Sequence, residues 1–170
     1  MINLKKTYLI AFVGIATLFS CEKEDFCDGQ VATPNMRIKF LDRANAENPK
    51  PIFRLACYAQ PQTPVDSVKV ILFSNTSEIQ LPLNINSSQT IWNLELTQII
   101  NNDTIIQTDQ LIFNYTPNPE YVSKACGYKT IFSNLTSSLN TNGTGIWITD
   151  YTPLTNNIIN EENHHAEIYY

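Results

Sequence analysis

The chain has 170 residues and a formal net charge of −5, with charged residues making up 16% of the sequence and aromatic residues 11%. This acidic balance, without a cluster of Lys and Arg, argues against nucleic-acid binding, which needs basic stripes against the phosphates. The aromatic content excludes a disordered chain, and the length fits one folded domain with a substantial core.

The N-terminus has the pattern of an export signal. Lys5-Lys6 precede an apolar run from Tyr8 to Phe19, which is shorter than the roughly 20 residues that span a bilayer. The run ends in Leu18-Phe19-Ser20-Cys21, which resembles the bacterial lipobox, with cleavage before Cys21 and acylation of its thiol. We therefore expect a lipoprotein signal peptide over residues 1–20. An ordinary secretory signal and an uncleaved anchor are the alternatives.

The residues after Cys21 predict a short lipidated tether. Glu22-Lys23-Glu24-Asp25 resembles the signal that sends some Gram-negative lipoproteins to the outer face of the outer membrane, although a solvated linker has the same composition. Cleavage removes two lysines and no acid, so the formal charge changes from −5 to −7. We expect a tether over residues 21–34 and a β-sandwich domain over 35–170. Lipid then holds the protein at the outer membrane, on the periplasmic face or at the cell surface.

The domain consists of short apolar segments separated by turns. Alternation or β-branched composition predicts strands at 36–41, 52–59, 67–74, 79–83, 92–97, 111–115, 121–132, 146–149 and 166–170. The strand over 67–74 is expected to be buried, and Pro82 is expected to place its strand at a sheet edge. Asn101-Asn102-Asp103 predicts a hairpin tip, Thr116-Pro117-Asn118-Pro119 the end of a strand, and Gly127 a bulge or a close backbone approach.

No segment after Cys21 has a sustained helical period. The spacing of strands and turns therefore predicts an all-β fold, an antiparallel β-sandwich of about eight or nine strands. A barrel is the alternative, since closure cannot be read from this pattern.

The chain has four cysteines, at positions 21, 27, 57 and 126. If Cys21 carries lipid, at most one disulfide forms among the other three, and export permits such a bond. Alternation places Cys57 on the expected core face of its strand, where a free thiol packs as a small apolar side chain. We therefore predict a Cys27–Cys126 disulfide and a free Cys57, with three reduced thiols as the alternative.

Several segments carry a resemblance to a known family. They are Cys21-Glu22-Lys23-Glu24-Asp25-Phe26-Cys27-Asp28, Thr33-Pro34-Asn35-Met36, Leu111-Ile112-Phe113-Asn114-Tyr115 and Tyr121-Val122-Ser123-Lys124-Ala125-Cys126-Gly127-Tyr128-Lys129-Thr130. Over nearly the whole mature chain, the sequence resembles the domain-of-unknown-function 6452 family of exported bacterial lipoproteins. The resemblance implies location and fold, and no mechanism. It supports the Cys27–Cys126 pairing, and Cys57 is not part of the family pattern.

The residues that could carry catalysis or bind metal are few and scattered. His164 and His165 are neighbours, so on a strand they point to opposite faces, and both are expected to be exposed. No Gly-x-Ser-x-Gly, Cys-x-x-Cys or calcium-loop motif is present. Solvated faces account for the interior acids, namely Glu95, Asp109 and Glu120. We expect no catalytic residue, no metal and no cofactor.

Two further sets of residues are candidate sites. Trp147 and Tyr151 could form an aromatic platform for sugar rings, and Trp147 has the opposite parity to Ile146 and Ile148 and is the better exposed candidate, with core or rim packing as the alternative. Ser67 and Thr104 lie in Asp-Ser/Thr-aliphatic triplets, which resemble the O-glycosylation site of one bacterial phylum.

These patterns predict a membrane-anchored lipoprotein of the bacterial envelope that acts as a non-enzymatic binding or structural module. Its partners would be the membrane, through the N-terminal lipid, and an envelope protein or a glycan. The alternative is a surface glycan-binding module that uses exposed aromatic residues.

Overall fold

The computed structural model of the chain describes residues 27, 32–60, 70–140 and 146–170. The predicted signal peptide, Cys21 and Ser67 lie outside the described residues. The chain divides into two compact units. The described part of the first unit is Cys27 with Tyr121–Tyr128, and that of the second is Ala32–Glu120 and Lys129–Tyr170, without residues 61–69 and 141–145.

Ten strands and no helix occur in the described residues, so the predicted all-β fold is confirmed. Their bounds are β1 Met36–Asp42, β2 Asn45–Pro49, β3 Ile52–Ala59, β4 Val70–Thr76, β5 Glu78–Leu81, β6 Gln89–Ile100, β7 Asp103–Ser123, β8 Gly127–Asn140, β9 Asp150–Pro153 and β10 Ala166–Tyr169.

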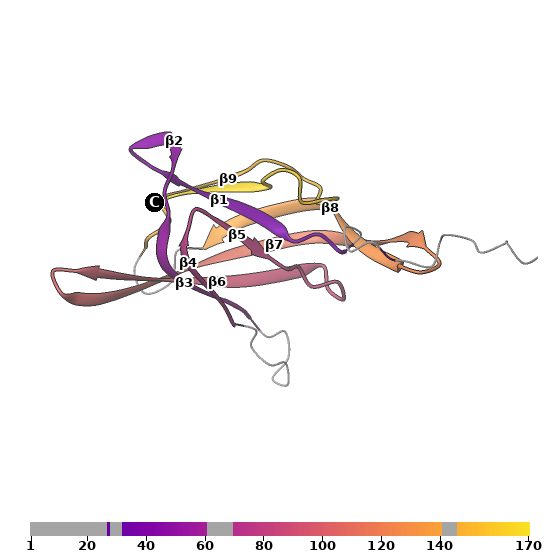
Figure 1. The fold of residues 1–170 in the computed structure, drawn as a ribbon, viewed down its shortest axis with the longest axis horizontal. Helices are drawn as coiled ribbons and strands as arrows, with labels where there is room; N and C mark the ends of the chain where they lie inside the picture. Colours follow the sequence, from indigo (N-terminus) through magenta and orange to yellow (C-terminus); the bar gives the residue numbers. More distant parts are fainter. Residues whose placement is uncertain (1–26, 28–31, 61–69, 141–145) are drawn as a thin grey trace, which may run out of the picture. The chain divides into compact units, whose positions relative to one another are not determined.

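The strands form the two sheets of a β-sandwich. One sheet has the order β2-β1-β10-β9, with β5 paired to β1, and the other has the order β4-β3-β6-β7-β8. Figure 1 shows β1 and β9 in one layer and β6 and β7 in the other. The pairs are antiparallel except β1 with β10, which run parallel with Ile38 opposite Ala166. A parallel pair needs a long connection, and here β1 and β10 come from opposite ends of the domain.

Alternating side chains of both sheets fill the core. In β6 the predicted set of Trp92, Leu94 and Leu96 is buried, and in β7 the predicted set of Leu111, Phe113 and Tyr115 is buried. The facing sheet contributes the buried residues Met36, Ile38, Phe40, Ile79, Leu81, Ala166 and Ile168. A period of two on each strand thus gives one continuous apolar layer between the sheets.

A row of amides crosses the outer face of the second sheet. Asn93 donates from Nδ2 to the carbonyl of Tyr58 over 3.3 Å and accepts at Oδ1 from Gln110 Nε2 over 2.7 Å. Gln110 in turn accepts from Asn140 Nδ2 over 3.0 Å. These uncharged side chains connect β3, β6, β7 and β8. Because its amide group is hydrogen-bonded, Asn93 can be buried on the face of the sheet away from the core.

The predicted hairpin tip is confirmed, whereas the predicted end of the following strand is wrong. Asn101 and Asn102 have φ of 52° and 69°, the left-handed pair of a tight hairpin turn. β7 then continues through Pro117 and Pro119 to Ser123. The N–H of Tyr115 points towards Ser88, just before β6 begins. Residues 117 and 119 share that side, so their missing N–H groups fall where the neighbouring strand has ended.

β4 is an outer strand of its sheet, not the buried strand that its composition predicted. Its side chain at Leu72 is 69% exposed. β4 pairs only with β3, with Leu72 opposite Ala56, so one of its edges carries no partner strand in the described sheet. An apolar run therefore indicated a strand correctly but could not place it in the sheet.

One buried carboxyl group joins the two sheets. Asp109 of β7 is 0% exposed, and its Oδ2 accepts the backbone N–H of Trp147 over 2.9 Å and that of Ile148 over 2.8 Å. The indole Nε1 of Trp147 donates to the carbonyl of Leu94 over 3.0 Å. These bonds fasten the segment that leads into β9 onto β6 and β7. The expectation that Asp109 lies on a solvated face is wrong.

The expectation that Trp147 is exposed is also wrong. Its side chain is 5% exposed and packs against Phe40 and Tyr170, with ring centroids 6.2 Å and 5.6 Å away. The alternation of buried and exposed side chains did not predict the burial of Trp147, because residues 146–149 do not form a regular strand. Two successive N–H groups turn towards one acceptor, so Trp147 and Ile148 are both buried while Ile146 is exposed.

Replacing Asp109 should destabilise the fold. Asp109→Ala leaves two buried N–H groups without an acceptor, at about 1–3 kcal/mol each, so we expect a loss of about 2–5 kcal/mol in the free energy of unfolding. Urea denaturation followed by circular dichroism measures this loss. Asp103→Ala, an exposed acid on the same strand, should change the value by less than about 0.5 kcal/mol. Equal effects of the two changes would contradict the role given to Asp109.

The buried thiol of Cys57 should be inert in the folded protein. Cys57 is 0% exposed, and burial raises its pKa to about 12, so the reactive thiolate is scarce at neutral pH. Iodoacetamide should leave Cys57 unmodified in the native protein and modify it after denaturation without reductant. Mass spectrometry of the peptides reads the result. Rapid modification of Cys57 in native protein would show that its strand is open.

Candidate functional site

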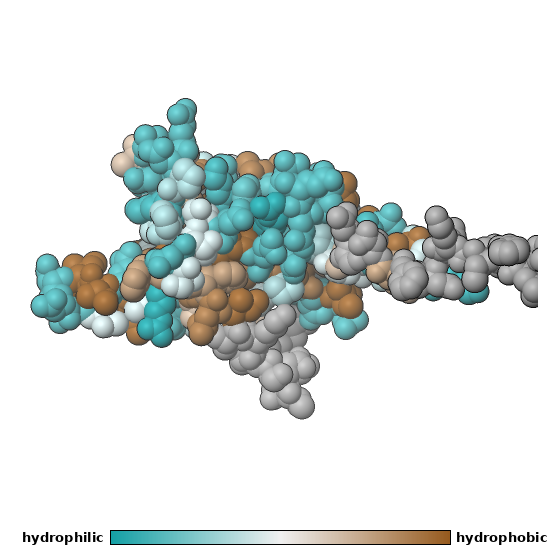
Figure 2. Space-filling view, in the orientation of Figure 1, coloured by the Kyte–Doolittle hydropathy of each residue, from teal (hydrophilic) through white to brown (hydrophobic). Residues whose placement is uncertain are grey.

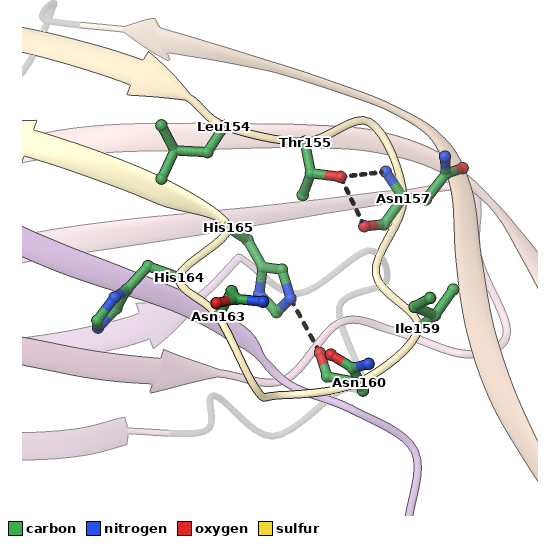
Figure 3. A pocket seen from close by; sticks show the side chains of 8 residues that line it. All are labelled: Leu154, Thr155, Asn157, Ile159, Asn160, Asn163, His164 and His165. Carbon is green, nitrogen blue, oxygen red and sulfur yellow. Dashed lines mark hydrogen bonds between the residues drawn. The ribbon is translucent and has the colours of Figure 1, made fainter.

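An open pocket of about 430 Å³ lies in the segment that connects β9 to β10. Figure 3 shows its lining, with the His165 ring between Asn163 and Asn160 and the His164 ring turned away from it. The lining residues are Leu154, Thr155, Asn157, Ile159, Asn160, Asn163, His164 and His165. Amide and imidazole groups thus dominate the polar part of the pocket.

Local hydrogen bonds shape the pocket wall. The Thr155 hydroxyl donates to the carbonyl of Asn157 over 3.0 Å and accepts its N–H over 3.1 Å, which forms a tight turn. Ile158 exchanges both backbone bonds with Phe132 of β8 and is buried. The connecting segment is therefore held against the second sheet and is not a free loop.

His165 is fixed by bonds at both ring nitrogens. Its Nδ1 accepts the backbone N–H of Arg37 over 2.9 Å, and its Nε2 lies 3.0 Å from the carbonyl of Asn160. A carbonyl only accepts, so the proton sits on Nε2 and the ring is neutral. Its pKa lies below the ordinary value because burial and the Arg37 charge disfavour the cation, against the opposing pull of the Asn160 carbonyl and Glu161. The expectation that His165 is exposed is wrong.

His164 belongs to a separate, exposed charge cluster. Its Nε2 lies 2.7 Å from Glu78 Oε2, and Arg37 Nη2 donates to the same oxygen over 3.0 Å. The hydrogen bond from His164, followed by that from Arg37, lowers the pKa of Glu78. Arg37 also donates from Nη1 to the carbonyl of Glu161 over 2.5 Å. The two histidines thus lie on opposite sides of the chain with different partners, as their adjacency predicted.

This geometry supports positioning and not proton transfer. Both nitrogens of His165 are committed to backbone groups, and the carboxyl of Glu78 is shared between His164 and Arg37. The described residues contain no group of three or more His, Cys, Asp or Glu side chains that could hold a metal ion. The pocket therefore has the groups to accept or donate hydrogen bonds to a small polar ligand.

The predicted aromatic platform is not present at Trp147 and Tyr151. Trp147 is in the core, and Tyr151 is half-buried with its hydroxyl donating to Ser137 Oγ over 2.8 Å. Burial raises the pKa of Tyr151. The buried Trp147 ring is therefore not available to stack on a sugar, and Tyr151 packs partly against the core.

The predicted Cys27–Cys126 disulfide is confirmed, with a Cα–Cα distance of 5.0 Å. It lies in the first unit, in the three-residue turn Lys124–Cys126 between β7 and β8. Gly127 follows the turn with φ of 70°, a conformation that glycine adopts without strain, so the expected bulge is a hairpin turn. Cys57 is free and buried, as predicted. Sequence reasoning found this centre because an exported chain with three remaining cysteines allows few pairings.

Exposed apolar side chains collect at two other places. One is the end of the β6–β7 hairpin, where Figure 2 shows apolar surface at the left. Its exposed residues are Ile99, Ile100, Ile105 and Ile106, beside the exposed Thr104 of the predicted glycosylation triplet. The other is the outer strand β4, where the exposed Leu72 lies at a groove of about 370 Å³ between β4 and β5. Alternation alone did not reveal these residues as exposed.

The pKa of His165 predicts a loss of stability in mild acid. The unfolded chain binds the proton at a higher pH than the folded chain, so the free energy of unfolding falls as pH decreases below about 6.5. Chemical denaturation at about pH 7 and about pH 5 measures the slope. His165→Gln should flatten it, whereas His164→Gln should keep most of it. A slope that His165→Gln leaves unchanged would contradict this assignment.

Comparison with known proteins identifies a family and no function. The model of a family of unknown function, DUF6452, matches residues 55–170. No curated protein and no solved structure matches the chain. In the described residues, no helix has the length and apolarity to cross a membrane. The family match covers most of the chain, from within β3 through β4 to β10, and includes Cys126, while Cys21 and Cys27 precede it. The chain therefore belongs to the family of unknown function DUF6452.

Proposed function

We propose that this protein is a membrane-anchored lipoprotein of the bacterial envelope, and that its β-sandwich is a non-enzymatic binding or structural module. The observation that carries the proposal is Leu18-Phe19-Ser20-Cys21 at the end of a short apolar run behind Lys5-Lys6. The Cys27–Cys126 disulfide supports it, because such bonds persist in oxidising compartments outside the cytosol.

The proposed anchor is a lipid on Cys21. A single acyl chain gives marginal, reversible binding, and two or more chains give a stable anchor. Acylation of Cys21 would leave the tether from residue 22 onwards in water, where its four acids within 22–28 are well solvated. The outer membrane is the proposed location, because Glu22-Lys23-Glu24-Asp25 resembles an outer-face export signal.

Binding or structural support fits the surface better than catalysis does. The polar groups of the β9–β10 pocket hold its own wall together, through Arg37, Asn160 and His165. The exposed β4 edge, with Leu72 and the adjoining groove, offers backbone and apolar contacts of the kind used in strand addition. An envelope protein is therefore the proposed partner.

Trp147, the main candidate residue of the glycan-binding alternative, is buried. The alternative depended on an exposed Trp147, whose ring lies against Phe40 and Tyr170 in the core. No other described feature favours a sugar ligand over a protein. O-glycosylation at Thr104 stays a prediction, and its exposed position beside the hairpin tip makes it accessible to a modifying enzyme.

Lipidation has a direct test. In cells given an alkyne fatty acid, the wild-type protein should take up the label and stay with membranes after a carbonate wash. Cys21→Ala should abolish both, because it removes the thiol that accepts the lipid. Ser20→Ala, which keeps a small residue before Cys21, should preserve both. Density-gradient separation of the membranes then tests the outer-membrane location. A protein that carries no label and still begins at residue 1 would overturn the proposal.

A further inference from the structure

We propose that the described end of the first unit, Cys27 with Tyr121–Tyr128, is a membrane-resting surface. Tyr121 and Tyr128 enter the lipid headgroup layer, and Lys124 faces the lipid phosphates. This inference rests on the proposed anchoring at Cys21. It adds which face of the protein meets the bilayer, and the ligand is the bilayer surface itself.

The two tyrosines form an exposed aromatic pair. Tyr121 is 59% exposed and Tyr128 is 71% exposed, and their rings stand edge to face with centroids 5.4 Å apart and planes at 68°. A tyrosine ring has an apolar body and a hydroxyl that remains hydrated, which is why tyrosine gathers at membrane–water interfaces. A paired, exposed set of such rings is suited to that layer.

The rings are held on a rigid frame. Tyr121 is on β7 and Tyr128 is on β8, on either side of the Lys124–Cys126 turn. The N–H of Cys126 donates to Ser123 Oγ over 3.1 Å, and the disulfide joins Cys126 to Cys27. Little conformational entropy is therefore lost when the two rings meet a surface.

The tether keeps this surface close to the bilayer. Cys27 follows Cys21 by six positions, and an extended chain of that length spans at most about 20 Å. The disulfide carries that limit from Cys27 to Cys126, between the two tyrosines. A contact too weak to recruit a free protein becomes effective here, because the anchor makes it intramolecular.

Charge permits the contact but adds little to it. Lys124 is exposed and is the one ionisable Lys, Arg, Asp, Glu or His among Cys27 and residues 121–128. A lysine near lipid phosphates gains about 1 kcal/mol. The tether carries four acids, Glu22, Glu24, Asp25 and Asp28, so the tyrosine rings must supply most of the contact.

Photo-crosslinking in a defined bilayer tests the inference. The acylated full-length mature protein is reconstituted into vesicles of phosphatidylethanolamine and phosphatidylglycerol that contain a phospholipid with a diazirine near its headgroup. After illumination, mass spectrometry maps the lipid adducts. We expect them on the peptide that contains residues 121–128.

Two matched variants distinguish this contact from nonspecific adsorption of apolar side chains to the bilayer. Tyr121→Ser with Tyr128→Ser should lower adduct formation at residues 121–128 severalfold, while membrane retention through the lipid persists. Ile99→Ser with Ile106→Ser removes exposed apolar groups of the β6–β7 hairpin and should leave the adducts unchanged.

The outcomes distinguish this inference from the proposed function. Protein that stays anchored but forms its adducts elsewhere, or forms them equally in the tyrosine variant, overturns the membrane-resting surface and leaves the anchor intact. If mass spectrometry of the protein purified from cells, before reconstitution, finds no lipid on Cys21, both are overturned. Adducts at residues 121–128 that depend on the tyrosines support both.

Discussion

The architecture of the sandwich depends on one buried acceptor, the Asp109 carboxyl group on β7. Apolar packing holds two sheets together but does not fix how a connecting segment passes between them. The pair of N–H groups at Trp147 and Ile148 meets a single oxygen of Asp109, and the indole N–H meets the carbonyl of Leu94. These directed bonds set where the chain leaves one sheet and enters the other. The other oxygen of Asp109, Oδ1, has no hydrogen-bond partner among the described residues. Only one of the two buried carboxyl oxygens is therefore hydrogen-bonded.

A second set of polar contacts, around Arg37 and His165, joins β1 to the segment before β10. The backbone N–H of His165 donates to the carbonyl of Arg37, the ring of His165 accepts the N–H of Arg37, and the guanidinium of Arg37 reaches Glu161 and Glu78. Each group is consumed in joining β1 to the segment before β10. A buried neutral histidine with two backbone partners is costly to protonate, so protonation of His165 would weaken this tie.

Sequence periodicity correctly predicted the features that depend only on residues close together in one strand or turn. The limits of β3, the buried faces of β6 and β7 and the Asn101-Asn102 turn all follow from local alternation and turn chemistry. The failures share one cause, since they depend on which strands meet. β4 has an apolar composition but no second neighbour, Trp147 lies in an irregular segment, and β7 passes two prolines because β6 has ended beside it. Asp109 and His165 accept hydrogen bonds from N–H groups that arrive from distant parts of the chain. No signal within a single strand could have revealed them.

The positions of the cysteines link folding to the proposed export and attachment. Thiol–disulfide exchange needs a thiolate with access to the disulfide, and a thiol whose pKa is about 12 is ionised in only about one molecule in 10⁵ at neutral pH. Once β3 is in the core, Cys57 can no longer attack the Cys27–Cys126 bond. The bond closes a loop across a sequence separation of 99 residues, which restricts the unfolded chain by about 4–5 kcal/mol in the entropy model. The core thus protects the bond, and the bond in turn stabilises the fold to which the anchor would be attached.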